Sequence, residues 1–261
     1  MKRIATAFSA FFLIVAPSAF ADTIKVVSSG GFAAAYKVLI PEFEKRTGDT
    51  VVSEWGPSMG TTENAVPQRL ARNEDIDVLI MVGDALDKLV ADKKVVADSR
   101  TPLAQSGIGI VVKEGAPAPD VSTPEALKKA LLAAKSVAYS DSASGVYIEK
   151  EMFDKLGIKA EMAAKAKMIP AVPVGSVVAS GQYELGFQQV SELKPIKGIK
   201  LIGQVPGNLQ KITVFSAGVV EGSHHVAVAR SLIDFLADPA NAAVIRDSGM
   251  ESLGKAPVNN Q

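Results

Sequence analysis

Short apolar strands alternate with amphipathic helices along most of this chain, and this order constrains the fold more than any other feature of the sequence. Residues 77–82 and 108–112 are continuously apolar, as expected for strands that are buried on both faces of a sheet. Residues 32–46 instead place apolar side chains at helical spacing. This alternation predicts an α/β protein in which parallel sheets lie between helices.

The same patterns predict where the elements lie. We expect strands at residues 23–28, 50–55, 77–82, 108–112, 137–140, 172–174, 185–188, 201–205 and 213–220. We expect helices at residues 32–46, 84–90, 123–134, 146–156 and 225–237, with others after the loop 56–62 and near residue 240.

Two polar segments that contain Pro or Gly, residues 99–106 and 206–211, predict that the chain crosses twice between two α/β lobes. The expected first lobe contains residues 22–104 and 209–261, and the second contains residues 105–208. A central cleft between the lobes is the natural place for a ligand.

The first 21 residues have the order of a secretory signal peptide. Lys2 and Arg3 precede an apolar run at 4–16, and the small residues Ala19 and Ala21 flank Phe20, with cleavage expected after Ala21. The run is too short to span a bilayer comfortably. Removing this segment leaves 26 basic and 28 acidic side chains, a net charge of −2. We therefore expect a periplasmic protein that does not insert into the membrane after cleavage.

Composition excludes several kinds of chemistry. The chain has no cysteine, so disulfides, thiolate metal sites and cysteine nucleophiles are excluded. Its two histidines, His224 and His225, are adjacent and resemble a surface helix start, so we expect no metal site. The balanced charge argues against nucleic acid as a partner.

Three loops rich in Ser, Thr and Gly follow predicted strands: the first loop (28–31), the second loop (58–62) and the third loop (142–145). If helices begin there, unpaired N–H groups and hydroxyls would form an anion site without a formal charge. Strand ends of open α/β sheets are where ligands bind. The alternative is that these hydroxyls are ordinary helix caps. No loop has the phosphate-binding or nucleophile-elbow pattern.

Other polar residues near these loops extend the candidate set. Arg69 follows the second loop, and arginine binds carboxylates with two hydrogen bonds. Its alternative role is on a solvated helix face. Tyr147 follows the third loop, with lobe packing as the alternative. Gln188 and Gln189 end an apolar strand, which indicates a ligand site, a hinge or a simple turn.

Taken in order, these segments resemble the type 2 periplasmic solute-binding proteins, and especially their molybdate-binding branch. The matching stretches are 41–44 (PEFE), 56–62, 76–80 (IDVLI), 145–147 (GVY), 185–187 (LGF) and 219–222 (VVEG). The resemblance implies a two-lobed fold with a central cleft. It also implies an anion held by serines and backbone N–H groups, with ligand loops around Ser29 and Ser58.

One departure from the molybdate-binding branch is informative. Those proteins carry a tyrosine in the loop where this chain has Gln188 and Gln189, and the second loop here contains Met59 and additional threonines. These differences favour a larger ligand that bears carboxylates. Within the fold, the chain resembles the periplasmic aconitate isomerases of pseudomonads, whose closest relatives are molybdate-binding proteins.

That resemblance implies an isomerase that interconverts trans-aconitate and cis-aconitate by a proton shift, without a cofactor. Preorganised donors would stabilise the charge that spreads into a carboxylate. The expected catalytic residues are Tyr147 and Glu63, with Glu54 as another possible base. The expected substrate-binding residues are Ser28, Ser29, Gly30, Gly31, Ser58, Met59, Thr61, Thr62, Arg69, Ser142, Ser144, Ser176, Gln188 and Gln189.

Two other functions use the same features. A non-catalytic receptor would deliver molybdate, or another small oxyanion or carboxylate, to the permease of an ABC transporter. A hydrolase using Ser58 or Ser144 is a weaker alternative, because no base accompanies either serine in a recognised pattern.

Overall fold

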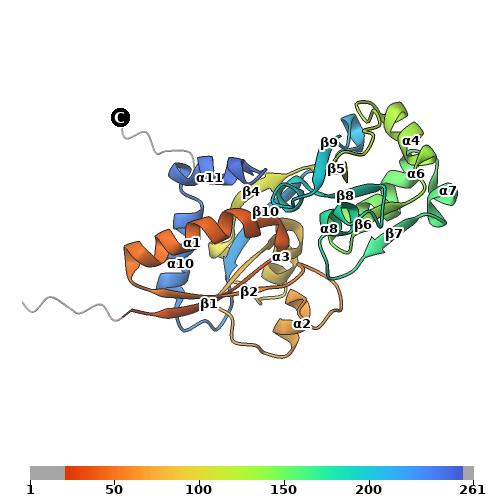
Figure 1. Ribbon diagram of the computed structural model, residues 1–261. Coiled ribbons are helices and arrows are strands. Elements are labelled where there is room, and N and C mark those ends of the chain that lie inside the picture. The colour runs from red at the N-terminus through yellow and green to blue at the C-terminus, as the bar shows by residue number, and fades with distance from the viewer. Residues whose placement is uncertain (1–20, 255–261) are drawn as a thin grey trace, which may run out of the picture.

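The computed structural model describes residues 21–254, which form two sheets covered by helices (Figure 1). The predicted α/β class is confirmed. The predicted signal peptide lies outside the described residues, apart from Ala21. Within residues 21–254, no helix has both the length and the apolar character needed to cross a membrane.

The first sheet has the strand order β11-β4-β10-β3-β1-β2. β1 pairs in parallel with β2 and β3, whereas β10 is antiparallel to both β3 and β4, so the expectation of wholly parallel sheets is wrong. The sheet is mixed because β10 returns from the other lobe. Its strands are β1 (Thr23–Ser28), β2 (Thr50–Trp55), β3 (Val78–Val82), β4 (Thr101–Ser106), β10 (Thr213–Val219) and β11 (Glu251–Ser252).

The second sheet has the order β7-β6-β8-β5-β9 and is also mixed. β6 is parallel to β7 and β8, and β5 is antiparallel to β8 and β9. Its strands are β5 (Ile108–Lys113), β6 (Val137–Ser140), β7 (Ala166–Ile169), β8 (Leu185–Gln189) and β9 (Ile199–Gln204).

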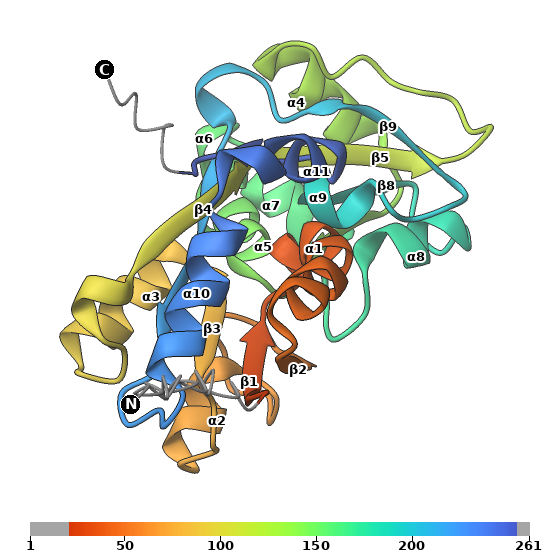
Figure 2. The ribbon, with the colours of Figure 1, turned by 90° about the vertical axis from the view of Figure 1, so that its left-hand side faces the viewer.

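Helices cover both faces of the first sheet. α1 and α10 pack on one face and bury Tyr36, Phe43 and Leu232, while α2 and α3 cover the other with Leu70 and Leu86. The helices of this lobe are α1 (Ala33–Thr47), α2 (Val66–Ala71), α3 (Gly83–Ala91), α10 (Val226–Leu236) and α11 (Ala242–Asp247). Figure 2 shows α1 and α10 on the same side of the strands.

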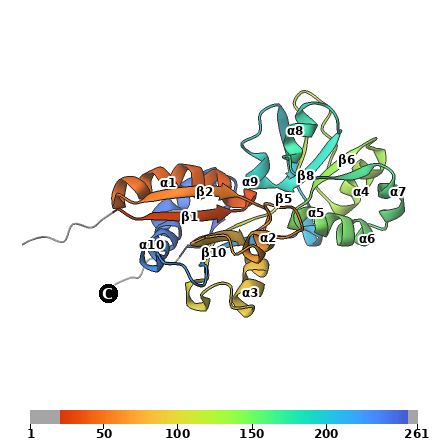
Figure 3. The same ribbon diagram turned by 90° about the horizontal axis from the view of Figure 1, so that it is seen from below.

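The second lobe has its own core, in which α4 packs Leu127 and Leu131 with Ile110 of β5. Its helices are α4 (Pro124–Ala133), α5 (Ala143–Tyr147), α6 (Phe153–Lys155), α7 (Lys159–Ala163), α8 (Val174–Ala179) and α9 (Val190–Leu193). A π-helical turn at Ile148–Met152 joins α5 to α6. Seen from below, α9 and α5 lie where the two lobes meet (Figure 3).

Several predicted elements differ from the observed ones. The strand expected at 172–174 is wrong, because Val174 begins α8. The segment 99–106, expected to be a polar linker, is mostly β4, whose Leu103 and Ala104 are buried in the first core. The helix expected at 146–156 begins earlier, at Ala143.

The chain passes between the sheets at Gly107 and again between β9 and β10. Gln189, the last residue of β8, contacts both crossings. With the amide oriented so that both of its ends are satisfied, its side-chain N–H group donates to the carbonyl oxygens of Ser106 (3.0 Å) and Gly107 (3.2 Å), and its oxygen accepts from the hydroxyl of Thr213 (2.8 Å). This amide therefore links the two connecting segments, and the hinge role considered for it remains a prediction. The lobe limits expected from the sequence remain a prediction.

Candidate functional site

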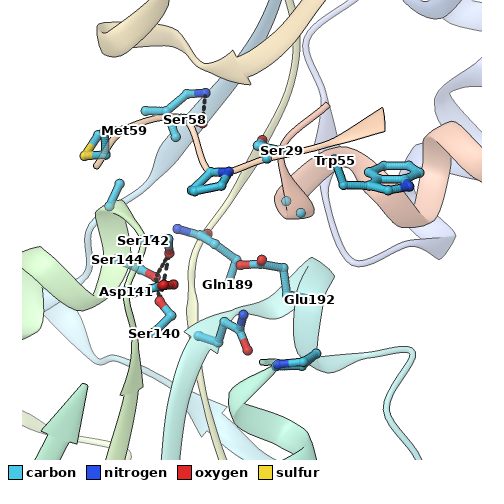
Figure 4. Close-up of a pocket in the computed structure, with 18 of the residues that line it drawn as sticks. Ser29, Trp55, Ser58, Met59, Ser140, Asp141, Ser142, Ser144, Gln189 and Glu192 are labelled. Atoms are coloured by element: carbon cyan, nitrogen blue, oxygen red, sulfur yellow. Dashed lines mark hydrogen bonds between the residues drawn. The ribbon is translucent and has the colours of Figure 1, made fainter. Parts of the chain in front are cut away.

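A cavity of about 360 Å³ lies between the lobes, where the loops after β1, β2, β3, β6 and β8 meet (Figure 4). Its volume is at the low end of the range for small-molecule sites, roughly 300–1,000 Å³. These predicted substrate-binding residues line it: Ser29, Gly30, Gly31, Ser58, Met59, Thr62, Ser142, Ser144, Gln188 and Gln189. The structure thus brings the three predicted loops together around one space.

The first loop presents donors from the first lobe. Ser29 is buried and its hydroxyl has no hydrogen-bond partner among the described residues, although it lines the cavity. Gly30 and Gly31 form a 3₁₀ turn before α1, so their N–H groups lie at a helix start without helical acceptors. Gly31 has to be glycine because the Phe215 ring occupies the position of a side chain. Ser28, also expected to bind substrate, is buried and does not line the cavity, and its hydroxyl donates to the Ser29 carbonyl (3.1 Å).

The second loop is not a helix start, contrary to the expectation, because α2 begins four residues after it, at Val66. Ser58 nevertheless has a defined orientation, since its oxygen accepts the N–H of Val82 (3.0 Å). The hydroxyl hydrogen of Ser58 is therefore available to a ligand. Thr61 is exposed and does not line the cavity, unlike its neighbour Thr62.

The third loop forms a cluster of three hydroxyls. Ser140 lies 2.7 Å from Ser142 and 3.1 Å from Ser144, oxygen to oxygen, and Ser142 lies 3.3 Å from Ser144. Ser142 precedes α5, but its hydroxyl makes no cap to the helix, and neither does that of Ser29 before the 3₁₀ turn. These serines are therefore not ordinary caps. Gly145 packs directly against the carbonyl of Ser140, which leaves no room for a side chain.

Glu192, on α9, is a lining residue that the sequence reasoning missed. Its carboxylate lies against Gly30 of the opposite lobe, at the position that a side chain there would occupy. Burial raises the pKa of Glu192 to about 7, a hydrogen bond from Gln188 opposes this rise, and the charge of Asp141 adds to it. An acidic residue in a first helical turn is commonly a partner of the helix dipole, so sequence alone does not distinguish it.

Asp141 shapes one rim of the cavity. Its carboxylate accepts the N–H of Ala171 (3.1 Å), a residue held in the left-handed region at φ +61°. Ala171, Val172 and Pro173 line the cavity beside it. Gln188 fixes the next segment, because its side-chain oxygen accepts the N–H of Val174 (2.9 Å), the first residue of α8.

The described wall of the cavity carries acidic side chains but no cationic ones. Among the described residues that line it, none is Lys, Arg or His, and Asp141 and Glu192 are the charged ones. Arg69, expected to bind a carboxylate, does not line it. The Arg69 guanidinium forms ion pairs with Glu54 and Glu74. Its Nε donates a hydrogen bond to the carbonyl of Asn64 (3.1 Å), a residue that does line the cavity. Arg69 therefore braces the segment that follows the second loop, at Asn64.

The expected catalytic residues also lie outside the cavity. Tyr147 is buried in the second lobe, where its hydroxyl donates to the Leu209 carbonyl (2.8 Å), so lobe packing explains it. Glu63 is exposed in the turn before α2, and Glu54 is bonded to Arg69. Ser176 is exposed on α8 and does not line the cavity.

Replacing Arg69 by Met should lower the free energy of unfolding by about 1–3 kcal/mol at pH 7, because charge-assisted hydrogen bonds of a largely buried side chain are lost. The hydrogen bond from Arg69 holds the pKa of Glu54 below its usual range. A depressed pKa stabilises the fold above the unfolded value of 4.5, so the difference between the proteins should begin to shrink below that pH and be lost as the pH falls through the lower folded-state pKa. Urea unfolding at pH 7 and pH 3 measures this.

Arg72→Met is the matched control, since Arg72 is 47% exposed and contacts Glu74 at 3.5 Å. This control substitution should lower the free energy of unfolding by less than about 1 kcal/mol. Equal losses in the two variants would contradict the bracing role of Arg69.

Residues 24–251 match the family of bacterial extracellular solute-binding proteins. An aconitate isomerase of Pseudomonas sp. is 48% identical over 235 residues, which cover 90% of each chain. A molybdate-binding protein of Azotobacter vinelandii is 28% identical over 248 residues, covering 90% of this chain and 92% of that protein.

Solved structures share the fold at low sequence identity. The periplasmic molybdate-binding protein of Azotobacter vinelandii superposes with a TM-score of 0.68 at 20% identity, over 87% of this chain and 98% of that one. The sulfate-binding protein of Mycobacterium tuberculosis gives a TM-score of 0.68 at 15% identity, over 89% and 87% of the two chains.

Proposed function

This chain belongs to the bacterial extracellular solute-binding protein family, and we propose that within it the chain is an aconitate isomerase that interconverts trans-aconitate and cis-aconitate. The observation that carries this function is the 48% identity to the Pseudomonas aconitate isomerase across 90% of both chains. The molybdate-binding relative is far more distant, at 28%. The protein is accordingly an isomerase that uses a binding-protein fold.

The chemistry of the cavity supports a carboxylate substrate. Hydroxyls of Ser29 and Ser58 and N–H groups at Gly30 and Gly31 face it from the first lobe, and the hydroxyl cluster 140–144 faces it from the second. Such neutral, fixed donors can hold several carboxylates at once without a salt bridge. The substrate would therefore contact both lobes.

The reaction itself moves one proton. Loss of a proton from the methylene carbon of aconitate leaves an electron pair that delocalises through the double bond. Return of a proton to the far carbon places the double bond on the other side of the central carbon. Donors aimed at a substrate carboxylate stabilise the charge that develops there, which is the contribution expected of the serine hydroxyls.

Incubation of the purified protein with trans-aconitate, followed by NMR, tests the function. We expect cis-aconitate to accumulate to the same final ratio that is reached from pure cis-aconitate. Absence of turnover, together with tight binding of molybdate by calorimetry, would instead identify a receptor for an ABC transporter.

The location proposed for the enzyme is the periplasm. Family relatives include periplasmic binding proteins, and residues 1–21 have the order of a cleavable signal peptide. Fractionation of cells and N-terminal sequencing should find the protein in the periplasm, beginning at Asp22.

A further inference from the structure

We infer that the carboxyl group of Glu192 carries the proton between the two carbons of the substrate, and that the same carboxyl both removes it and returns it. This inference rests on the proposed function and adds a catalytic residue to it. Neither Tyr147 nor Glu63, which the sequence favoured, is placed to do this, because neither lines the cavity.

Geometry singles out Glu192 among the groups that could act as a base. Among the described residues lining the cavity, only Asp141 and Glu192 are ionisable near neutral pH. Asp141 accepts the N–H of Ala171, a strained residue of the rim, and so has a structural task. Glu192 instead reaches across the junction to Gly30, with its carboxylate between the donors of the two lobes. Figure 4 shows it rising from α9 toward Ser29.

The surroundings of Glu192 suit proton exchange. The side chain is only partly exposed, and its burial brings its pKa to about 7, where a carboxyl group gives and takes protons with similar ease. Asp141 is the charged group that faces it from the third loop, and Gln188 faces it from β8 as a neutral hydrogen-bond partner. Because no described lining residue is cationic, the proton affinity of Glu192 is not reduced by a neighbouring positive charge.

One carboxyl group is sufficient for the whole proton transfer. The Glu192 carboxylate takes a proton from the methylene carbon, and the C–H electron pair enters the allylic system. The resulting Glu192 carboxylic acid donates that proton to the other terminal carbon, where a new C–H bond forms, and Glu192 is again a carboxylate. A single carboxyl reaches only one face of the allylic plane, so removal and return take place on the same face.

The first test compares Glu192→Gln with Glu161→Gln, an exposed residue of α7 that serves as a matched control. Glutamine keeps the size of the side chain but cannot accept the proton. We expect kcat of Glu192→Gln to fall by about 10²–10⁴-fold, while calorimetry still detects binding of trans-aconitate. The control should keep full activity. The kcat/KM of the unaltered protein should rise with pH and level off above about pH 7.

The second test follows the proton. The unaltered protein is given trans-aconitate with deuterium on the methylene carbon, in ordinary water, and the product of the first turnovers is examined by NMR. Deuterium at the newly formed methylene carbon supports the single-carboxyl path, and its complete absence would overturn that path. Undiminished kcat in Glu192→Gln would overturn the role of Glu192. Failure of the unaltered protein to convert aconitate would overturn the proposed function itself, which separates the two failures.

Discussion

At pH 8, the Glu192→Gln protein is expected to unfold at a temperature about 5–10 °C above that of the unaltered protein. The folded-state pKa of Glu192 is about 7, above the usual value of 4.5. The folded protein therefore binds this proton more tightly than the unfolded chain does, and stability is lost as the pH rises through this interval. Above pH 7 the charged carboxylate costs the fold up to roughly 3 kcal/mol, which a neutral amide avoids.

Thermal unfolding without ligand, followed by circular dichroism between pH 4 and pH 8, measures the effect. The two proteins should unfold at nearly the same temperature at pH 4, where the carboxyl is mostly protonated in both states, and diverge as the pH rises. Glu161→Gln should show no such divergence. A Glu192→Gln protein that is less stable at pH 8 than the unaltered protein would contradict the argument.

Gain of stability with loss of activity is the usual sign of a residue kept for function. Glu192 would be such a residue, because burial and the charge of Asp141 disfavour its carboxylate and no described lining residue is a cation. The same measurement thus separates a functional carboxylate from a structural one.

The second large effect is expected for Gly145→Ala. The methyl group of alanine would overlap the carbonyl of Ser140, a backbone atom that cannot rotate away. Forced packing of this kind costs about 1–3 kcal/mol or more, equivalent to a fall in unfolding temperature of several degrees. Relief by movement of α5 would also displace Ser142 and Ser144, so we expect kcat/KM to fall by at least tenfold.

Gly83→Ala is a milder comparison, because a methyl group at this first residue of α3 would lie 3.2 Å from the ends of the Arg100 and Ser216 side chains, which have to shift only by a few tenths of an ångström. Its unfolding temperature should change less than that of Gly145→Ala, because side chains can shift where the Ser140 backbone cannot and because alanine also favours the helix. Calorimetry and steady-state kinetics of both variants make the comparison. A Gly145→Ala protein with the stability and activity of the unaltered protein would show that α5 tolerates displacement.

The sequence predicted the local parts of this structure well. Continuous apolar runs located β3 and β5, and Gly48 marked the end of α1, where it adopts φ +82°. The wrong prediction of a strand at 172–174 has a local cause. Val172 and Val174 favour a strand, but Pro173 lies between them and immediately precedes a helix, α8.

The candidate site was predictable only where its residues follow strands. Ser29, Ser58 and Ser142 lie at strand ends, and strand ends meet in one place in an α/β fold. Arg69 is of the right type for a carboxylate ligand, but its partners Glu54 and Glu74 come from β2 and from the turn after α2. Glu192 contacts Gly30, which is 162 residues away in the sequence, and no local sequence pattern predicts such a contact.

The cation-free wall of the cavity also bears on how long a ligand stays. A transport receptor benefits from retention, because it has to carry its cargo to a permease. A catalyst has to release its product, and release often limits turnover. Hydroxyls and backbone N–H groups recognise the positions of the substrate oxygens. The two acidic side chains of the described wall repel a polyanion and so shorten the time for which it stays bound. A site that recognises its substrate by the directions of hydrogen bonds, and not by opposite charge, would allow a protein with this fold to release its product fast enough for catalysis.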